Sequence, residues 1–310
     1  MKKTLLAMTA IGAIGCSLGI AAAQSKDPVR IGVPTAMTGA YADLGNQVKR
    51  AVDLAVEEAN AAGGVDGRKV ETRFLDTEAK ADVARAQGEK LALGGYSLLI
   101  GTIASGEGLA LGPQLGKWDA LYLSTVNKGN AITGASCNAR MFRANHPDNS
   151  DAAVVKPWLA TRKETKWAAI GMDGAWGRDS VASFKAAAQG KEVLSESFSP
   201  LGTTDYAPYI QKIVESGAQG LWVALAGRDA ITFGTQAKQF GLFDKMFVAG
   251  TSFVTDSTVK AMGDISKGIW GIVNYSSTLD APANKAFVAA WQKKYPGTDP
   301  TNFEGETYMG

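Results

Sequence analysis

The chain has 310 residues, of which 45% are hydrophobic and 20% are charged, and its formal net charge is +2. These values describe an ordinary globular protein with enough apolar residues for one large domain or two domains of common size. No run of five or more like charges occurs in the sequence, so neither a nucleic acid nor a membrane surface is indicated as a partner.

The first residues have the build of an export signal. Two lysines give a positive start, an apolar run follows, and Ala23 ends a stretch of small residues. The apolar run is short for a membrane span. The pattern therefore predicts a signal peptide at 1–23 that is cleaved near Ala23 and Gln24, and an exported protein. Two alternatives stay open, which are an uncleaved N-terminal anchor and a lipoprotein attached at Cys16.

Short apolar or β-branched runs then alternate with Ala-rich amphipathic stretches. The first of these stretches, 46–62, carries one apolar stripe at helical spacing and ends at two glycines, as many helices do. The strands predicted in this first series are 29–34, 70–75, 97–100 and 120–123, and the helices are 46–62, 80–93 and 109–117.

A second series of strands and helices follows an irregular segment at 127–143. Its predicted strands are 167–172, 192–198, 221–225, 247–249 and 269–273, and its predicted helices are 150–161, 178–189, 206–216, 228–240 and 284–294. Strands that alternate with helices imply parallel sheets covered on both faces. Two such series are too many for one compact sheet, so the predicted fold class is α/β, with two doubly wound parallel-sheet lobes.

The two ends of the chain raise a question about cysteine pairing. Signal cleavage removes Cys16 and leaves Cys137 alone, either as a buried thiol or with a partner outside this chain. Residues 302–310 have the pattern of the opening of a further element. We therefore expect the chain to be C-terminally truncated.

The loops that follow the strands are the places to look for a ligand site, because ligands bind outside the carboxyl ends of the strands in open α/β sheets. Ser105 precedes the helix predicted at 109–117, where it is either a plain helix cap or part of a site for a carboxylate. Tyr41 and Trp176 lie in such loops. Their rings are either local packing residues or the two sides of an apolar clamp for a small organic ligand.

No set of residues predicts catalysis. The single histidine, His146, has no second histidine or cysteine pair nearby, and the sequence contains no nucleophile elbow or phosphate-binding loop. We therefore expect no catalytic residue, no metal site and no cofactor. The chain is predicted to bind a molecule and not to be an enzyme.

Several segments match one family in order and spacing. They are VRIGVP at 29–34, MTGAYA at 37–42, EEANAAGGV at 57–65, GTTDY at 202–206, FGL at 240–242 and PANK at 282–285. The chain from Val29 to its last residue resembles the periplasmic substrate-binding proteins of the branched-chain amino-acid (leucine/isoleucine/valine-binding) ABC transporter family.

This resemblance implies a type I periplasmic-binding fold, in which two lobes joined by a hinge close on a ligand. It implies lobes at 29–145 plus 273–310 and at 146–272, with the last elements missing beyond 310. It also implies a periplasmic receptor, expected to be a monomer, that delivers a small molecule to an inner-membrane ABC permease. The alternatives are a ligand-sensing receptor or regulator domain of the same fold and an exported α/β enzyme.

The resemblance also implies ligand positions. Ser105 matches the family serine that holds a carboxylate, Tyr41 and Trp176 match aromatic positions on opposite lobes, and the remaining matches are Ile103, Ala104, Val126 and Lys128.

The sequence departs from the family at two further ligand positions. Ala226 and Gly227 stand where amino-acid binders have a tyrosine, and Ser252 and Phe253 stand near the place of an acid that pairs with the ligand ammonium. A buried ammonium without a counter-charge is costly. An aromatic or aliphatic acid, or an amide, therefore fits as well as a branched-chain amino acid, and Lys128 is a candidate partner for a carboxylate.

Overall fold

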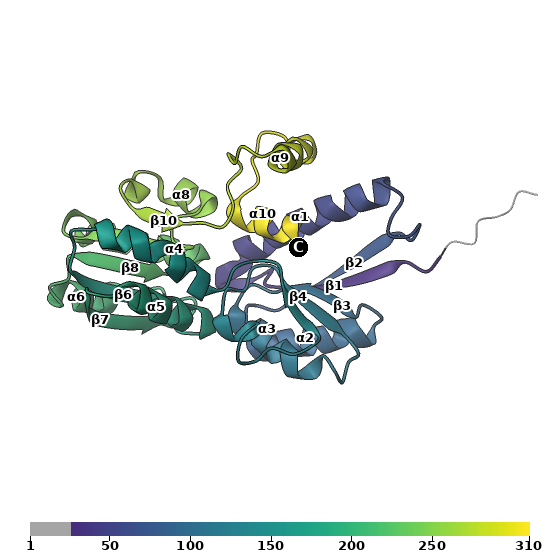
Figure 1. Ribbon diagram of the computed structural model, residues 1–310, viewed down its shortest axis with the longest axis horizontal. Helices are drawn as coiled ribbons and strands as arrows, with labels where there is room; N and C mark the ends of the chain where they lie inside the picture. The colour runs from purple at the N-terminus through teal and green to yellow at the C-terminus, as the bar shows by residue number, and fades with distance from the viewer. Residues whose placement is uncertain (1–25) are drawn as a thin grey trace, which may run out of the picture.

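Two parallel β-sheets of five strands each lie side by side along the long axis of the molecule (Figure 1). They are seen in a computed structural model that describes residues 26–310, so the predicted signal peptide and the alternatives at Cys16 lie outside the described residues. The first sheet has the strand order β2 (Val70–Asp76), β1 (Val29–Thr35), β3 (Leu98–Gly101), β4 (Leu121–Ser124) and β5 (Met141–Arg143).

Helices cover both faces of the first sheet, because successive side chains along each strand point to opposite faces and both faces carry apolar residues. Leu99 of β3 and Tyr122 of β4 belong to the apolar cluster with Leu91 and Leu111, which lie on α2 (Ala81–Leu93) and α3 (Ser105–Leu111). On the other face, Val33 of β1 packs in a cluster with the apolar stripe of α1 (Ala42–Ala61). This sheet therefore lies between helices on both faces.

The second sheet repeats this layered arrangement. Its order is β10 (Trp270–Ile272), β9 (Phe247–Thr251), β8 (Gly220–Ala224), β6 (Lys166–Met172) and β7 (Glu192–Ser199). Trp167 and Ala169 of β6 pack with one pair of helices, and Ala168 and Ile170 pack with another. The first pair is α4 (Asp148–Thr161) and α5 (Ala175–Ala187), and the second pair is α6 (Ala207–Glu215) and α7 (Gly227–Gln239). α8 (Asp256–Met262) packs beside α7.

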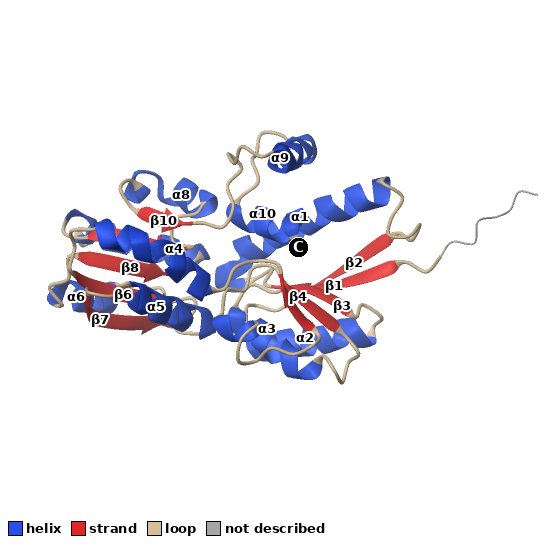
Figure 2. Ribbon diagram, viewed as in Figure 1, coloured by secondary structure: helices blue, strands red, loops and turns tan. Residues whose placement is uncertain are grey.

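The last two helices return to the first sheet although they follow the second sheet in sequence (Figure 2). They are α9 (Pro282–Lys294) and α10 (Asn302–Met309), and both pack on α1. Leu54 of α1 joins Phe287 and Trp291 of α9 in one apolar cluster, and Arg50 forms an ion pair with the buried Glu304 of α10. The chain thus passes twice between the two sheets, after β5 and after β10.

The predicted fold class is confirmed, because the structure is α/β with two parallel five-stranded sheets and flanking helices. The helix predicted at 109–117 is wrong, since the α-helix is Ser105–Leu111 and a short 3-10 turn follows it. The reason is Pro113, which has no N–H and whose ring clashes with the preceding helical turn. The three-residue strand β5 and the short helix α8 were not predicted.

Candidate functional site

The loops after strands of both sheets surround one small cavity of about 20 Å³. That volume holds about one water molecule and is far below the range of about 300 to 1,000 Å³ for small-molecule sites, so the two sheet units have to separate before a small organic ligand can enter. The first-sheet side contributes loops after β3 and β4, and the second-sheet side contributes residues after β6, β8 and β9. The lining side chains are Tyr41, Leu44, Ile103, Ala104, Val126, Lys128, Trp176, Ala226, Ser252 and Phe303.

Eight of the eleven sequence-predicted site residues line this cavity. The three that do not are Ser105, Gly227 and Phe253. The structure also adds Leu44 and Phe303, which sequence reasoning missed. Phe303 lies on α10 just inside a capping box in which the Thr301 side chain accepts from the Glu304 N–H. The Thr-x-x-Glu spacing is a helix-start signal that could have placed Phe303 on a helix.

Ser105 is buried and holds two loops together. The Gly129 N–H donates to Ser105 Oγ at 2.8 Å, which ties the start of α3 to the loop after β4. The helix begins at Ser105 itself, so the expected role as a cap for a helix at 109–117 is wrong. In this arrangement Ser105 supports the loop that carries Val126 and Lys128.

Phe253 and Gly227 have packing roles at the edge of the cavity. Phe253 is fully buried, and its ring lies 5.9 Å from the ring of Phe233 in an edge-on contact. Gly227 has a φ of +57°, and a Cβ there would lie 3.0 Å from the Ala40 carbonyl oxygen. Glycine at this position therefore lets the start of α7 approach the segment just before α1.

Lys128 is the cation of the cavity lining, and its ammonium is already paired with residues of the second-sheet unit. It bonds to Asp151 of α4 and donates to Thr251 Oγ1 of β9 at 3.2 Å, and only 5% of Lys128 is exposed. Burial alone would lower the pKa of Lys128, but the nearby carboxylates, chiefly Asp151, raise it above its usual value. An ammonium has three N–H donors, so one remains for a further acceptor.

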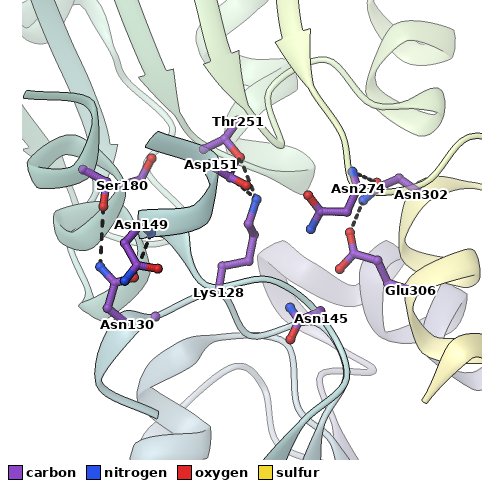
Figure 3. A network of polar contacts seen from close by, with 12 residues as sticks. Lys128, Asn130, Asn145, Asn149, Asp151, Ser180, Thr251, Asn274, Asn302 and Glu306 are labelled. Atoms are coloured by element: carbon purple, nitrogen blue, oxygen red, sulfur yellow. Dashed lines mark hydrogen bonds and ion pairs between the residues drawn. The ribbon is translucent and has the colours of Figure 1, made fainter. Parts of the chain in front are cut away.

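Further polar contacts join the two sheets beside Lys128 (Figure 3). The Asn130 N–H donates to Asp179 Oδ2 of α5 at 2.7 Å, and the Asn149 N–H of α4 donates to Asn130 Oδ1 at 2.9 Å. Tyr41 and Trp176, which approach from opposite sides, share one buried apolar cluster. The two sheet units are therefore in direct contact around the cavity, as in a closed clamp.

Glu107 holds the loop that carries Ile103 and Ala104. Its Oε2 accepts from the Ile103 N–H at 3.1 Å and from the Ala104 N–H at 2.6 Å. Burial raises the pKa of Glu107 to about 7, against the effect of these hydrogen bonds, which lower it. The loop geometry on this side of the cavity thus depends on one buried carboxyl group.

Replacing Glu107 with alanine is expected to lower the free energy of unfolding by about 2 to 4 kcal/mol, because two buried N–H groups lose their acceptor. Glu107→Gln is the matched control, since its amide oxygen can accept from the same N–H groups, and we expect less than half of that loss. Urea unfolding followed by circular dichroism measures both. Equal losses in the two variants would show that the acceptor oxygen does not hold the loop.

Groups for other chemistry are sparse within residues 26–310. Across that range no cluster of three or more His, Cys, Asp or Glu side chains is arranged to hold a metal ion. Cys137 is exposed and has no disulfide partner in the same range, so the alternative of a buried thiol is wrong and the alternative of a partner outside this chain stays untested. The described part of the chain also has no helix with the length and apolar character that a bilayer crossing requires.

Comparison with known proteins finds one family along nearly the whole chain. The family profile described as a periplasmic binding protein matches residues 28–310. The Leu/Ile/Val-binding protein homolog 3 of Brucella melitensis is 26% identical over 298 residues, which cover 95% of this chain and 79% of that protein.

Solved structures share the fold. A solute-binding protein from R. palustris in complex with benzoate has a TM-score of 0.84 at 22% identity, over 91% of this chain and 78% of that one. The branched-chain amino acid transporter substrate-binding protein LivJ from Streptococcus pneumoniae, in complex with isoleucine, has a TM-score of 0.81 at 20% identity, over 91% of this chain and 81% of that one.

Proposed function

This chain belongs to the periplasmic binding protein family, and from that premise we propose that it is the solute receptor of an ABC importer. The family and its fold are those of substrate-binding receptors and not of enzymes. In this proposal two lobes, 29–145 plus 273–310 and 146–272, close on a small carboxylated ligand. The supporting observation is the cavity between the two sheets, which takes its lining from loops of both.

The charge of the cavity lining favours an acid that lacks an ammonium group. Lys128 is the charged residue of the lining, and none of the described residues that line the cavity is acidic. An amino-acid ligand would bury its ammonium without a dedicated counter-charge, which costs several kcal/mol. Lys128 keeps one donor for a ligand carboxylate. We therefore propose an aromatic or aliphatic carboxylate ahead of a branched-chain amino acid or an amide.

Two polar atoms of the lining are consistent with a bound molecule. The Tyr41 hydroxyl and the Trp176 Nε1 are buried, and neither has a hydrogen-bond partner among the residues that the structure describes. Buried polar groups normally have partners. A ligand between the two rings can supply them, while the rings contribute apolar contact area.

The wider setting follows from the same family assignment. We propose that the signal peptide at 1–23 directs the protein to the periplasm, and that it works there as a monomer that meets an inner-membrane ABC permease. Closure around the ligand would be the state that the permease recognises. No cofactor is part of this proposal.

A ligand series tests the proposed class. Purified protein, freed of co-purified ligand by unfolding and refolding, is heated with benzoate, leucine or benzamide. Benzoate at 100 times its Kd adds about 2.7 kcal/mol of stability. For a chain of this length, with an unfolding entropy of about 2.1 cal/mol/K per residue, we expect the melting temperature to rise by about 4 to 5 °C. Stronger stabilisation by leucine than by benzoate would contradict the proposed class, and chemical turnover of any of the three would contradict a receptor.

A further inference from the structure

A cluster of charged side chains lies where the chain passes between the two proposed lobes. Lys128 follows β4, Asp148 and Asp151 open α4 directly after the first passage, and Glu306 lies on α10 beside the second passage. We call Lys128, Asp148, Asp151 and Glu306 the hinge cluster. All four are buried, with 1% to 6% of each residue exposed. Figure 3 shows Lys128 pointing toward Asp151, with Glu306 near Asn274 and Asn302.

The members of the hinge cluster differ in how well they are paired. Asp151 bonds to Lys128 and accepts from Thr251 Oγ1 at 3.2 Å. Glu306 Oε1 accepts from Asn302 Nδ2 at 2.7 Å, whereas its Oε2 has no hydrogen-bond partner within residues 26–310. Neither carboxyl oxygen of Asp148 has a partner in that described range. Two of the three acids are thus buried with oxygens left unsatisfied.

The second passage is tied to this cluster through α10. The Asn274 N–H donates to Asn302 Oδ1 at 2.8 Å, and Asn302 in turn donates to Glu306. At the first passage, the Asp148 N–H donates to the Lys128 carbonyl oxygen at 2.9 Å. Any rotation of one lobe against the other therefore changes the surroundings of these acids.

The charges of the cluster do not balance if every acid is ionised. Three carboxylates face the single ammonium of Lys128. The other charged groups that act on Asp148 are Asp179 of α5, which adds negative charge, and Arg143 of β5. The Arg143 guanidinium donates to the carbonyl oxygens of Asn127 and Gly129. An excess of buried negative charge costs several kcal/mol, and protonation removes it.

We propose that closure of the lobes takes up protons at the hinge cluster, so that mild acid strengthens ligand binding. The inference rests on the proposed function, because it needs two lobes that open and close. In the closed arrangement Glu306 and Asp148 are buried and hold protons. When the lobes separate, water reaches both groups, and they ionise and release those protons.

The direction of the pH effect follows from the pKa shifts in the closed state. Burial raises the pKa of Glu306 to about 7 and raises the pKa of Asp148 well above its usual range. In water a glutamate has a pKa of about 4.3. The stabilisation of the closed state is therefore complete below the open-state pKa and is lost as the pH rises to the closed-state pKa. For each proton that closure takes up, a rise of one pH unit within that window weakens ligand binding by up to about tenfold.

Calorimetric titration with benzoate between pH 5.5 and 8.5 tests the proposal. We expect the affinity to fall as the pH rises from 5.5 and to level off only above the closed-state pKa values of both Glu306 and Asp148. Repeating the titration at pH 6 in two buffers of different ionisation enthalpy is expected to give an uptake approaching two protons per benzoate bound, one at Glu306 and one at Asp148.

Glu306→Gln is the decisive variant, because the amide keeps the hydrogen bond from Asn302 and cannot titrate. We expect it to make the pH dependence shallower and to reduce the proton uptake by about one, because Asp148 still titrates. Glu304→Gln is the matched control, since Glu304 is a buried acid of the same helix whose partner, Arg50, lies in the same lobe. This control is expected to keep the pH dependence of the unchanged protein.

A second readout works without any ligand. Small-angle X-ray scattering of the ligand-free protein is expected to show a smaller radius of gyration at pH 5.5 than at pH 8, and the Glu306→Gln variant is expected to lose this difference. Benzoate affinity and scattering that do not change with pH would overturn the proton coupling and leave the receptor function intact. Compaction in acid with no binding of benzoate, leucine or benzamide would support the coupling and count against the proposed ligand class.

Discussion

Replacing Lys128 with methionine is expected to weaken benzoate binding by more than about 100-fold, since the loss of one member of a buried ion pair costs about 3 to 5 kcal/mol and 1.4 kcal/mol is tenfold. The change leaves the Asp151 carboxylate buried without its ammonium, beside the acids of the hinge cluster. The closed state bears this cost because Lys128 and Asp151 come from the two different proposed lobes and meet where these are in contact. Calorimetric titration at a fixed pH measures the loss.

A double variant separates the two roles of Lys128. The double variant with Lys128→Met and Asp151→Leu leaves no unpaired charge at either position. The closed state is therefore expected to regain its stability. If Lys128 also binds the ligand carboxylate, affinity stays at least about tenfold below that of the unchanged protein, because a hydrogen bond to a charged group contributes about 1.5 to 3 kcal/mol. Full recovery would mean that Lys128 acts only between the lobes. An affinity of Lys128→Met within threefold of the original would contradict both roles.

Replacing Trp167 with alanine is expected to lower the free energy of unfolding by about 3 to 5 kcal/mol, the range for removal of a fully buried tryptophan. The Trp167 side chain is fully buried in β6, and its ring lies 5.4 Å from that of Phe184 and 6.2 Å from that of Phe247. Its Nε1 also donates to the Glu164 carbonyl oxygen at 3.1 Å. The neighbours of the ring are held by a sheet and a helix, so they cannot move to fill the space that the missing indole leaves.

Urea unfolding measures this loss in the free energy of unfolding, and it is followed by circular dichroism because that signal does not depend on the replaced tryptophan. Trp270→Ala is the matched control, because Trp270 stacks on Trp158 at 4.0 Å but is only partly buried at the edge strand β10. We expect it to cost less than half as much as Trp167→Ala. Equal costs would show that the central position of β6 in the sheet does not set the stability of this unit.

Much of the fold could be predicted from the sequence because the signal for each long element is local. β6 is a continuous apolar run, as expected of a strand buried on both faces, and α1 has an apolar stripe with the period of a helix; both elements were predicted, with boundary errors of one to four residues. β5 has only three residues, which is too short for a period to emerge, and it exists because it pairs with β4. α8 is also too short for a period to emerge, because it is a helix of seven residues that packs on α7.

The site was predicted in its location, and its polar contacts were not. The rule that ligands bind beyond the carboxyl ends of parallel strands led to residues that do line the cavity, including Ile103 in a loop and Trp176, which was expected in a loop and lies in the first turn of α5. Nothing near Lys128 in the sequence indicates that its ammonium meets Asp151, 23 residues away, or Thr251, 123 residues away. Ser105 likewise turns toward Gly129 and not toward the cavity.

The sequence by itself determined most of the long strands and helices, their alternation in two series, and several of the loops at the cavity, because these properties follow from local pattern and chain direction. Only the tertiary structure decided which charges meet. Lys128, Asp148, Asp151 and Glu306 come from three segments far apart in the chain, and their burial and pairing depend on how two sheets and a returning helix pack together. Charge interactions act through space and depend on burial, and sequence spacing encodes neither property.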